Sequence, residues 1–312
     1  MDFIKGFEFR LLGGDHPRAV VEAFDARNST ATLDVGILSD DAVGAAFEVH
    51  SPEEAPTLAA RLVTGTPSGS PLPPMSMRLA TTRGTNALLE RRGARTALFI
   101  TKGFGDLLLI GDQQRPDLFA LDIHKPQPLY EAVVEVPERV SADGSVLEPI
   151  RIEAIGDEVS RLNETGVRSA AVVLAHSYVN PSHELMVAEF LRANGFEHVS
   201  CSTTLAPFIK IVPRAQTTVV NAYLSPVIDD YIARVQAPLL PTRRHSDYAT
   251  DREEQGSLHV MTSAGGMVQP GSYHAKDSLL SGPAGGVVGA ARAARLSGFE
   301  KIITFDMGGT ST

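Results

Sequence analysis

Apolar and polar residues recur along the chain with two different periods, and segments of the two kinds alternate from about residue 78 onward. Near-continuous apolar runs at residues 95–101 and 168–176 predict strands that are covered on both faces. Two further strands are predicted near residues 129–136 and at residues 257–266. Because segments with a helical period separate these strands, the pattern predicts a mainly α/β protein.

The helical segments of this part are predicted at residues 81–93, 151–166, 217–235 and 279–298. A further helix is predicted after Asn180 as its N-cap, with Pro181 at the first helical position. In the long segment 217–235, Pro226 removes one backbone hydrogen bond and is expected to kink the helix. One face of residues 151–166 is apolar and consists of Ile152, Ile155, Val159 and Leu162.

The first 77 residues have a different organisation. Residues 19–38 predict two strands joined by a polar turn, and residues 51–63 predict a helix with acidic residues in its first turn. Residues 64–74 are rich in glycine, serine and proline and predict a linker without ladder hydrogen bonds. The pattern therefore divides the chain into residues 1–77, which end with this linker, and residues 78–312.

Charge and composition narrow the classes of function. The chain has 312 residues, 43% of them hydrophobic, and a formal net charge of -9. An acidic protein repels nucleic acid and anionic membrane surfaces, so neither is an expected partner. No apolar run approaches the 18 or so residues of a membrane-spanning helix, and the single cysteine, Cys201, cannot form an internal disulfide. These features predict a soluble, cytoplasmic protein.

The last residues of the sequence contain a candidate phosphate-binding hairpin. An apolar strand is predicted at residues 301–305, followed by Asp306, Gly308, Gly309 and Thr310. Glycines let backbone N–H groups approach phosphate oxygens, and the carboxylate is placed to hold Mg²⁺ directly or through water. The alternative interpretation is an ordinary Gly-Gly hairpin without a ligand.

Two other stretches combine glycine with hydroxyl groups. Residues 281–291 open a helix with small side chains, which suits either an anion at the helix N-terminus or close packing of the helix on a sheet. Thr81, Thr82, Thr85 and Asn86 lie just before and within the start of another helix. N-capping explains one or two of these four side chains, so Thr82, Thr85 and Asn86 are candidate contacts in a cleft or with a neighbouring subunit.

His176 and His183 lie seven residues apart near the end of a predicted strand. A pair of zinc ligands is conceivable, but the sequence offers no third ligand, and hydrogen-bonded structural histidines are the favoured interpretation. No Ser-His-Asp order, nucleophile elbow or Walker motif is present. The sequence therefore predicts no bound metal in this chain and leaves the catalytic residues unassigned.

Taken together, these stretches resemble the hydantoinase A/5-oxoprolinase family. Within that family the resemblance is closest to the small, nucleotide-binding-type (delta-like) subunit of acetophenone carboxylase. It implies an incomplete actin/hexokinase/Hsp70-like (ribonuclease H-like) nucleotide-binding fold, with mixed sheets flanked by helices. The segments that carry it are spread over about three quarters of the chain, from residue 80 to residue 312: residues 80–140, 175–184, 217–231, 263–268, 279–291 and 303–312.

The sequence departs from the family pattern at both ends. Family members begin with a first phosphate hairpin, whereas residues 6–25 here contain Gly13-Gly14-Asp15 without the leading acid and the trailing threonines. Residues 1–77 are therefore expected to be a degenerate N-terminal segment of the first subdomain plus the linker. The second hairpin stops at Thr312, so residues 78–312 are expected to form the family's α/β region up to that hairpin.

The resemblance implies a function at the level of an assembly. We expect a structural or accessory subunit of a heteromeric ATP-dependent carboxylase, a ligase that forms a C–C bond between an acetophenone-type ketone and bicarbonate through phosphorylated intermediates. The implied partners are larger hydantoinase A-like and hydantoinase B-like chains. ATP and Mg²⁺ are implied for the complex, without tight binding by this chain alone. Two alternatives are a component of an ATP-dependent hydantoinase or 5-oxoprolinase, and a non-catalytic scaffold with a vestigial nucleotide site.

Overall fold

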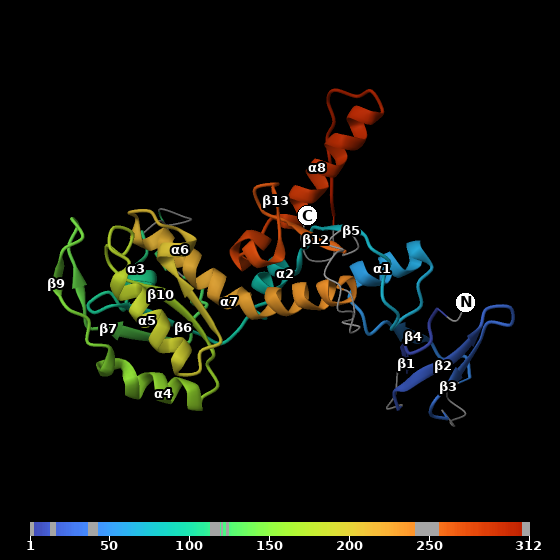
Figure 1. The fold of residues 1–312 in the computed structure, drawn as a ribbon, viewed down its shortest axis with the longest axis horizontal. Helices are drawn as coiled ribbons and strands as arrows, with labels where there is room; N and C mark the ends of the chain where they lie inside the picture. Colours follow the sequence, from blue (N-terminus) through green and yellow to red (C-terminus); the bar gives the residue numbers. More distant parts are fainter. Residues whose placement is uncertain are drawn as a thin grey trace, which may run out of the picture. The chain divides into compact units, whose positions relative to one another are not determined.

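A computed structural model of the chain describes residues 3–12, 17–36, 43–112, 119, 121–122, 125–240 and 256–307. The chain divides into two compact units (Figure 1). The first comprises Met1–Leu79 and Tyr231–His259, and the second comprises Ala80–Asp230 and Val260–Thr312. Each unit is therefore built from two separate stretches of the sequence.

The first unit contains a four-stranded antiparallel sheet with the strand order β3-β2-β1-β4. Its strands are β1 (Glu8–Leu11), β2 (Ala19–Asp25), β3 (Thr30–Leu33) and β4 (Phe47–His50). The two strands predicted within residues 19–38 are confirmed as β2 and β3, which pair across the polar turn. Phe7, Leu11, Ala19 and Val21 are buried and supply the apolar core of this sheet.

The predicted helix of the first unit is α1 (Ala55–Thr64), and it begins later than the pattern predicted. Pro56 lies in its first turn, where a missing N–H and a fixed φ favour a helix start. The acidic residues Glu53 and Glu54 consequently precede the helix, and the prediction of acids within its first turn was wrong. The carboxylate of Glu53 instead pairs with the buried guanidinium of Arg61, whose Nε lies 2.5 Å from Oε2.

Arg61 also fixes the linker. One of its terminal nitrogens donates to the carbonyl oxygens of Pro67 and Ser70, each at 2.7 Å. The segment 64–74 forms no strand, as its composition predicted, but these bonds tie it to α1, and the side chain of Leu72 is buried. The first unit continues into β5 (Ser76–Leu79).

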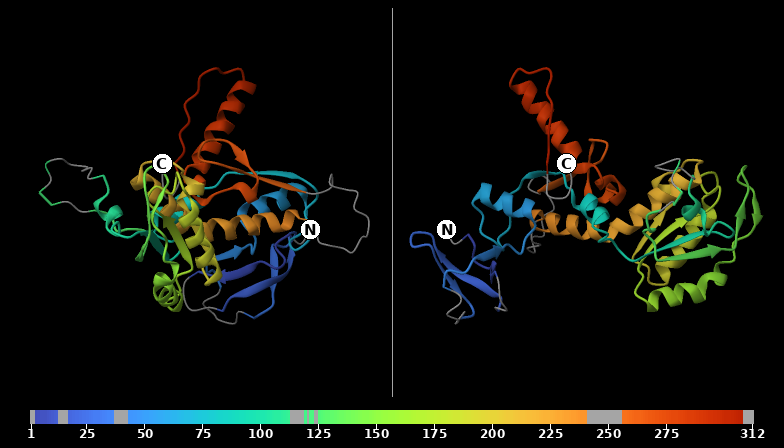
Figure 2. Two further views of the ribbon diagram at one scale, coloured as in Figure 1. Left: turned by 60° about the vertical axis from the view of Figure 1, so that its left-hand side comes forward. Right: turned by 180° about the vertical axis from the view of Figure 1, so that it is seen from behind.

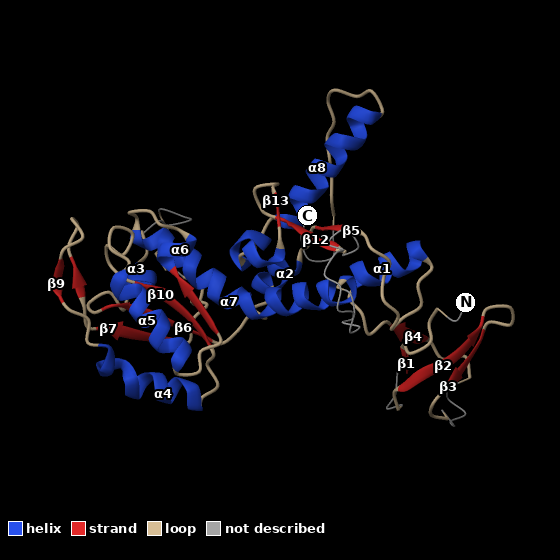
Figure 3. Cartoon of the chain, viewed as in Figure 1, coloured by secondary structure: helices blue, strands red, loops and turns tan. Residues whose placement is uncertain are grey.

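The second unit is organised around a four-stranded parallel sheet with the order β11-β10-β6-β7 (Figure 3). The strands are β6 (Thr96–Thr101), β7 (Ala132–Val136), β10 (Ser169–Val173) and β11 (His198–Cys201). Every residue of β6 and β10 is buried, which explains their continuous apolar runs. The strands predicted at residues 95–101, 129–136 and 168–176 are thus confirmed.

Helices cover both faces of this sheet (Figures 1 and 2). On one face lie α4 (Gly156–Glu164), which follows the 3-10 turn η2 (Ile152–Ile155), and α5 (Ser182–Ala193). On the other face lie α7 (Ile211–Gln236) and the short α3 (Leu107–Ile110). The face predicted for residues 151–166 is confirmed, because Ile155, Val159 and Leu162 are buried against the sheet and Ile152 packs beside them.

Helix α7 is longer than the helix predicted at residues 217–235, and its buried residues are not all apolar. It has 26 residues with Pro226 inside it, and it begins six residues before the predicted segment. Leu224, Tyr231 and Val235 are buried, but so are Arg214 and Asn221. A helix that is enclosed on several sides needs partners for its polar residues, which the sequence pattern did not reveal.

The remaining elements are short or lie at the edges of the units. The strands β8 (Arg139–Val140) and β9 (Val146–Glu148) form a hairpin, and β12 (Ser257–Met261) pairs antiparallel with β13 (Met267–Val268). The helical elements are α2 (Arg83–Leu89), α6 (Ser202–Leu205), α8 (Ser281–Leu296) and the 3-10 turns η3 (Ala237–Leu239), η5 (Pro270–Ser272) and η6 (Ala275–Ser278). Among the described residues, no helix has the length and apolar character that a membrane span requires.

The strand predicted at residues 301–305 is absent from the structure, so this prediction was wrong. Residues 301–307 return along α8 as an irregular segment (Figure 2, red). The exposed fractions are 99% for Ile303, 75% for Phe305 and 68% for Met307. A strand is stabilised by the neighbour with which it pairs, and no described strand lies beside this segment.

Candidate functional site

Two of the polar stretches singled out in the sequence meet in the second unit, at the starts of α2 and α8. The hydroxyl of Thr85 donates a hydrogen bond to the carbonyl of Leu279, 194 positions further along the chain. The backbone N–H of Thr81 donates to the hydroxyl of Ser281 at 3.4 Å, and that hydroxyl donates to the carbonyl of Met261 at 2.6 Å. The hydroxyl groups at this junction therefore bind neighbouring backbone and hold the two helix starts together.

The three candidate residues of α2 have different environments. Thr82 is exposed at the N-cap position, but the capping bond comes from Thr81, whose hydroxyl accepts the N–H of Arg83 at 3.0 Å. Thr85 is occupied by its bond to Leu279. Asn86 is half-buried, and its side chain makes no hydrogen bond within the described part of the chain. Thr82 and Asn86 thus keep polar groups that a ligand or a neighbouring chain could use.

The glycines at the start of α8 allow close packing against residues 80–82. A Cβ atom on Gly282 would lie 2.6 Å from the methyl carbon of Thr82, and one on Gly285 would lie 2.6 Å from the Cβ of Ala80. By contrast, a Cβ on Gly286 or Gly289 would meet nothing within 4 Å. Of the two interpretations left open by the sequence, the geometry of Gly282 and Gly285 supports close packing.

Asp306 lies on the irregular segment after α8 and is exposed. Gly308, Gly309 and Thr310 lie outside the described residues, as do Gly13, Gly14 and Asp15 near the start of the chain. No hydrogen bond or ion pair in the described structure joins Asp306 to Thr82, Thr85 or Asn86. Thr82, Thr85 and Asn86 therefore lie together at the start of α2, and Asp306 forms no hydrogen bond or ion pair with them in the described structure.

A second polar cluster lies where the parallel strands end. The hydroxyl of Thr101, the last residue of β6, donates to Oε1 of Glu138 and accepts the N–H of Ala175 at 2.8 Å. The other carboxylate oxygen of Glu138 lies 2.8 Å from Nδ1 of His183. Glu138 and His183 are both buried. The prediction of a hydrogen-bonded structural histidine is thus confirmed for His183.

Glu184 and Arg214 extend this cluster, and both are fully buried. Oε2 of Glu184 accepts the N–H of Leu174 at 3.1 Å and the hydroxyl of Ser202 at 2.8 Å, while Oε1 accepts the N–H of Thr203 at 2.7 Å. Burial lowers the pKa of Arg214, and the negative charge of Glu184 opposes that shift. Arg214 donates to three oxygens, of Leu174 (2.9 Å), Ser202 (3.1 Å) and Ser177. The carboxylate and the guanidinium therefore compensate each other through shared partners.

His176 is the exception in this cluster. It follows β10 with a left-handed φ of 57°, which is uncommon for a residue other than glycine. Its Nδ1 is buried and has no hydrogen-bond partner in the described structure, so the interpretation as a bonded structural histidine does not extend to His176. The described residues hold no group of three or more His, Cys, Asp or Glu side chains placed to bind a metal ion.

The strand order of the sheet bears on the position of His176, which follows β10. The chain enters the sheet as β6 and places β7 on one side of β6. It then returns and adds β10 and β11 on the other side of β6. In open parallel sheets, ligand sites lie outside the carboxyl ends of the strands where the strand order reverses in this way. Here that point lies between β6 and β10, where Thr101 and Ala175 are joined by a hydrogen bond.

Comparison with known families agrees with these features. The family model described as Hydantoinase/oxoprolinase N-terminal region matches residues 29–195, and the model described as Hydantoinase/oxoprolinase matches residues 214–312. The chain belongs to the hydantoinase/oxoprolinase family. The two matches together include three of the four strands of the parallel sheet (β6, β7 and β10), the junction of α2 with α8, and the candidate residues from Asp306 to Thr310.

Several characterised proteins are similar to this member of the family. The 5-oxoprolinase of Saccharomyces cerevisiae is 39% identical over 269 residues, and 5-oxoprolinase 1 of Arabidopsis thaliana is 41% identical over 260 residues. Each alignment covers 76% of this chain, but only 20% and 19% of the respective relative. The acetophenone carboxylase gamma subunit of Aromatoleum aromaticum is 30% identical, over 75% of this chain and 33% of that subunit. The chain thus spans between about a fifth and a third of these relatives.

Solved structures confirm the fold class. A nucleotide-free structure of acetone carboxylase aligns with a TM-score of 0.62 over 75% of this chain and 34% of its own, at 22% identity. The ATP-dependent caprolactamase from Pseudomonas jessenii aligns with a TM-score of 0.61 over 96% of this chain and 42% of its own, at 26% identity. This hydantoinase/oxoprolinase chain therefore has the α/β fold of the actin-like ATPase group, with mixed sheets and flanking helices. The family comprises ATP-dependent enzymes.

The close packing at α8 can be tested by adding one methyl group at two neighbouring positions. Gly285→Ala should lower the free energy of unfolding by about 1–3 kcal/mol, because the new Cβ would overlap Ala80. Gly286→Ala, the matched control, should be neutral or should stabilise the protein by up to about 1 kcal/mol, since alanine is the better helix former. Denaturant unfolding measures both, and equal effects of the two variants would contradict the packing interpretation.

The buried charge pair can be tested with an isosteric change. Glu184→Gln replaces an acceptor of three hydrogen bonds by a group with only one acceptor oxygen, and it leaves Arg214 without an opposing charge. We expect a loss of about 3 kcal/mol or more in the free energy of unfolding. Glu189→Gln, on the exposed side of the same helix, is the control and should change stability by less than about 0.5 kcal/mol. A loss below 1 kcal/mol for Glu184→Gln would show that the pair is not essential to the fold.

Proposed function

We propose that this chain is the nucleotide-binding-type component of an ATP-dependent enzyme that hydrolyses a cyclic amide. The observation that carries the proposal is the level of identity. Proteins named 5-oxoprolinase are 36–41% identical over 76% of the chain, whereas the carboxylase gamma subunit is 30% identical over a similar share. The caprolactamase structure, which also acts on a cyclic amide by its title, aligns over 96% of the chain.

The chemistry of a cyclic amide explains why ATP would be needed. The carbonyl of an amide is a poor electrophile, and phosphorylation of its oxygen makes the carbonyl carbon open to attack by water. The C–N bond of the ring then breaks as nitrogen takes up a proton, and hydrolysis of the resulting acyl phosphate releases phosphate and the ring-opened acid. Transfer of the phosphoryl group requires charge neutralisation by Mg²⁺ and by N–H groups aimed at the phosphate oxygens. These parts can come from several segments or chains, which is compatible with a component that spans a fifth to a third of its relatives.

In this proposal the phosphate contacts come from the last residues of the sequence. Asp306 would hold Mg²⁺ through water, and Gly308, Gly309 and Thr310 would contact phosphate. The exposed carboxylate of Asp306 has no ion-pair partner among the described residues, and a free carboxylate is a donor that suits Mg²⁺. Thr82 and Asn86 keep unused polar groups and would contact the cleft or a neighbouring subunit, while Thr85 would serve mainly to hold α2 against residue Leu279.

A ketone carboxylase is the second candidate. It is favoured by the similarity to the acetophenone carboxylase gamma subunit over 75% of the chain. The substrates would then be a ketone and bicarbonate, and the partners would be larger hydantoinase A-like and hydantoinase B-like subunits. A role of this chain as the delta-like subunit belongs to the same candidate.

The two candidates differ in what drives ATP consumption. With the protein purified together with its natural companion chains, we expect phosphate release that depends on 5-oxo-L-proline or a related cyclic amide and yields the ring-opened acid. Labelled bicarbonate should not enter an acid-stable product. Incorporation of that label in the presence of acetophenone or acetone, without turnover of any cyclic amide, would establish the carboxylase instead.

The role of Asp306 is tested in the same assembled enzyme. Asp306→Asn should slow ATP consumption by about 10- to 100-fold, because residues that hold a metal through an intermediate ligand typically have effects of this size. Glu300→Gln, an exposed acid six positions earlier, is the matched control and should leave the rate unchanged. An Asp306→Asn enzyme with the normal rate would show that this phosphate site is idle.

A further inference from the structure

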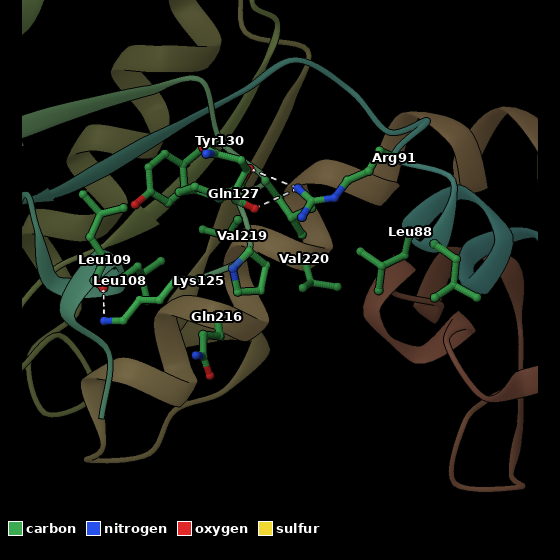
Figure 4. A pocket seen from close by; sticks show the side chains of 14 residues that line it. Leu88, Arg91, Leu108, Leu109, Lys125, Gln127, Tyr130, Gln216, Val219 and Val220 are labelled. Carbon is green, nitrogen blue, oxygen red and sulfur yellow. Dashed lines mark hydrogen bonds between the residues drawn. The ribbon is translucent and has the colours of Figure 1, made fainter. Parts of the chain in front are cut away.

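The second unit contains a cavity of about 490 Å³ that none of the candidate nucleotide residues lines. Its walls come from four segments: the end of α2, the short helix α3, residues 125–130 and the middle of α7 (Figure 4). Pockets for small molecules generally have volumes of about 300–1,000 Å³. The size therefore suits a single small organic molecule.

Most of the lining is apolar. Leucine side chains come from α2, from α3 and from position 129, two prolines come from residues 125–130, and Val219 and Val220 come from α7. Figure 4 shows the leucines of α2 and of α3 on opposite sides, with the valines of α7 between them. This lining favours the apolar body of a ligand, which gains free energy when it leaves water.

The charged groups of the lining are all cationic. Arg91 and Lys125 line the cavity, and among the described residues no Asp or Glu does. Burial raises the pKa of the Tyr130 phenol, another lining residue, so that it stays neutral and adds no negative charge. An apolar cavity with only positive charges at its rim complements an anionic ligand.

Both cations retain donors for a ligand. One terminal nitrogen of Arg91 donates to the carbonyl oxygens of Gln127 (2.8 Å) and Pro128 (3.3 Å). Nζ of Lys125 donates to the carbonyl oxygens of Leu109 (2.6 Å) and Ile110 (2.9 Å). These carbonyl oxygens orient the guanidinium of Arg91 and the ammonium of Lys125, but they carry no net charge, so both side chains stay positively charged. A guanidinium has five N–H donors and an ammonium has three, so each has capacity left for a carboxylate.

The backbone at Arg91 indicates that its side chain is needed there. The N–H of Arg92 bonds to the carbonyl of Ala87, and that of Arg91 to the carbonyl of Leu88, which together form a Schellman cap at the end of α2. The residue after the C-cap in such a motif is usually glycine, because φ is positive. Here it is Arg91, with a φ of 56°. A left-handed conformation at a residue with a long side chain is strained, and strain of this kind is concentrated at ligand clamps.

We propose that this cavity binds a small organic acid, with its apolar body on the leucines, prolines and valines and its carboxylate paired with Arg91. Lys125 adds to the positive potential of the rim. This site is separate from the proposed nucleotide contacts, and it does not depend on which reaction the assembled enzyme carries out.

Binding can be measured on the full-length chain with a matched pair of probes, 2-naphthoate and its neutral analogue 2-naphthamide, by isothermal titration calorimetry. We expect naphthoate to bind at least tenfold more tightly than naphthamide. Arg91→Gly should remove this preference by raising the Kd of naphthoate at least tenfold, while naphthamide binding stays within twofold. The thermal midpoint should be unchanged or higher, because glycine suits the positive φ. Arg92→Gln, the neighbouring arginine outside the lining, is the matched control and should change neither Kd.

Two further variants test whether the probes bind in this cavity and whether a loss of stability explains a loss of binding. Leu88→Trp should fill the cavity and abolish binding of both probes. Arg91→Asn, which also tolerates a positive φ, should reproduce the effect of Arg91→Gly if the latter lowers the thermal midpoint. Equal binding of the two probes, binding of neither, or binding that survives Leu88→Trp would overturn the proposal. Loss of naphthamide binding in Arg91→Gly would show that Arg91 shapes the cavity rather than pairing with the carboxylate.

Discussion

Glu184 and Arg214 are closed off from solvent, and the arrangement of the second unit depends on how they compensate each other. Removing a carboxylate and a guanidinium from water costs several kcal/mol per ion unless each is matched by charge and by hydrogen bonds. Here both bind Leu174 and Ser202, which follow β10 and β11. The pair thereby fastens α5 and α7, from opposite faces, to the same carboxyl edge of the sheet.

From this anchor, α7 positions the rest of the second unit. About two turns beyond Arg214, the carbonyl of Ala222 accepts the hydroxyl of Ser169 at 2.6 Å, and Oδ1 of Asn221 accepts the N–H of Lys276 at 3.0 Å. The carbonyl of Tyr223 accepts the N–H of Ala94. At the preceding residue, Gly93, an added Cβ would overlap the ring of Tyr223. Helix α7 thus forms hydrogen bonds with the sheet, with the segment after α2 and with the segment that leads into α8.

The sequence predicted those elements whose stability is local or whose burial is complete. Strands β6 and β10 were evident because a strand buried on both faces has few polar residues, and the face of α4 was evident from its spacing. The pairing of Glu184 with Arg214 was not predictable, because the two residues are 30 positions apart and each resembles an ordinary surface charge in its own helix. Arg214 also precedes residue 217, where the predicted helix began, so the helical pattern gave no signal of its burial.

For the candidate site, the sequence could name residues but not their use. The small residues at the start of α8 fit an anion site and a packed helix equally well, and only the positions of Ala80 and Thr82 separate these readings. Thr85 looked like a ligand contact because its partner, the carbonyl of Leu279, is 194 positions away. Backbone partners of this kind leave no trace in composition or spacing, so hydroxyl groups that hold elements together cannot be told from hydroxyl groups that bind a ligand.

Residues 301–307 have the alternating pattern of a strand, but they do not form one in the structure. Alternation places Ile303, Phe305 and Met307 on one face of an extended chain and Asp306 on the other. In the structure all four are exposed, because nothing described here pairs with the segment. A neighbouring strand would bury the three apolar side chains and fix the direction of Asp306 in the same step. If Asp306 acts on magnesium as proposed, its geometry is therefore set by whatever pairs with residues 301–307, and catalysis and assembly share one structural requirement.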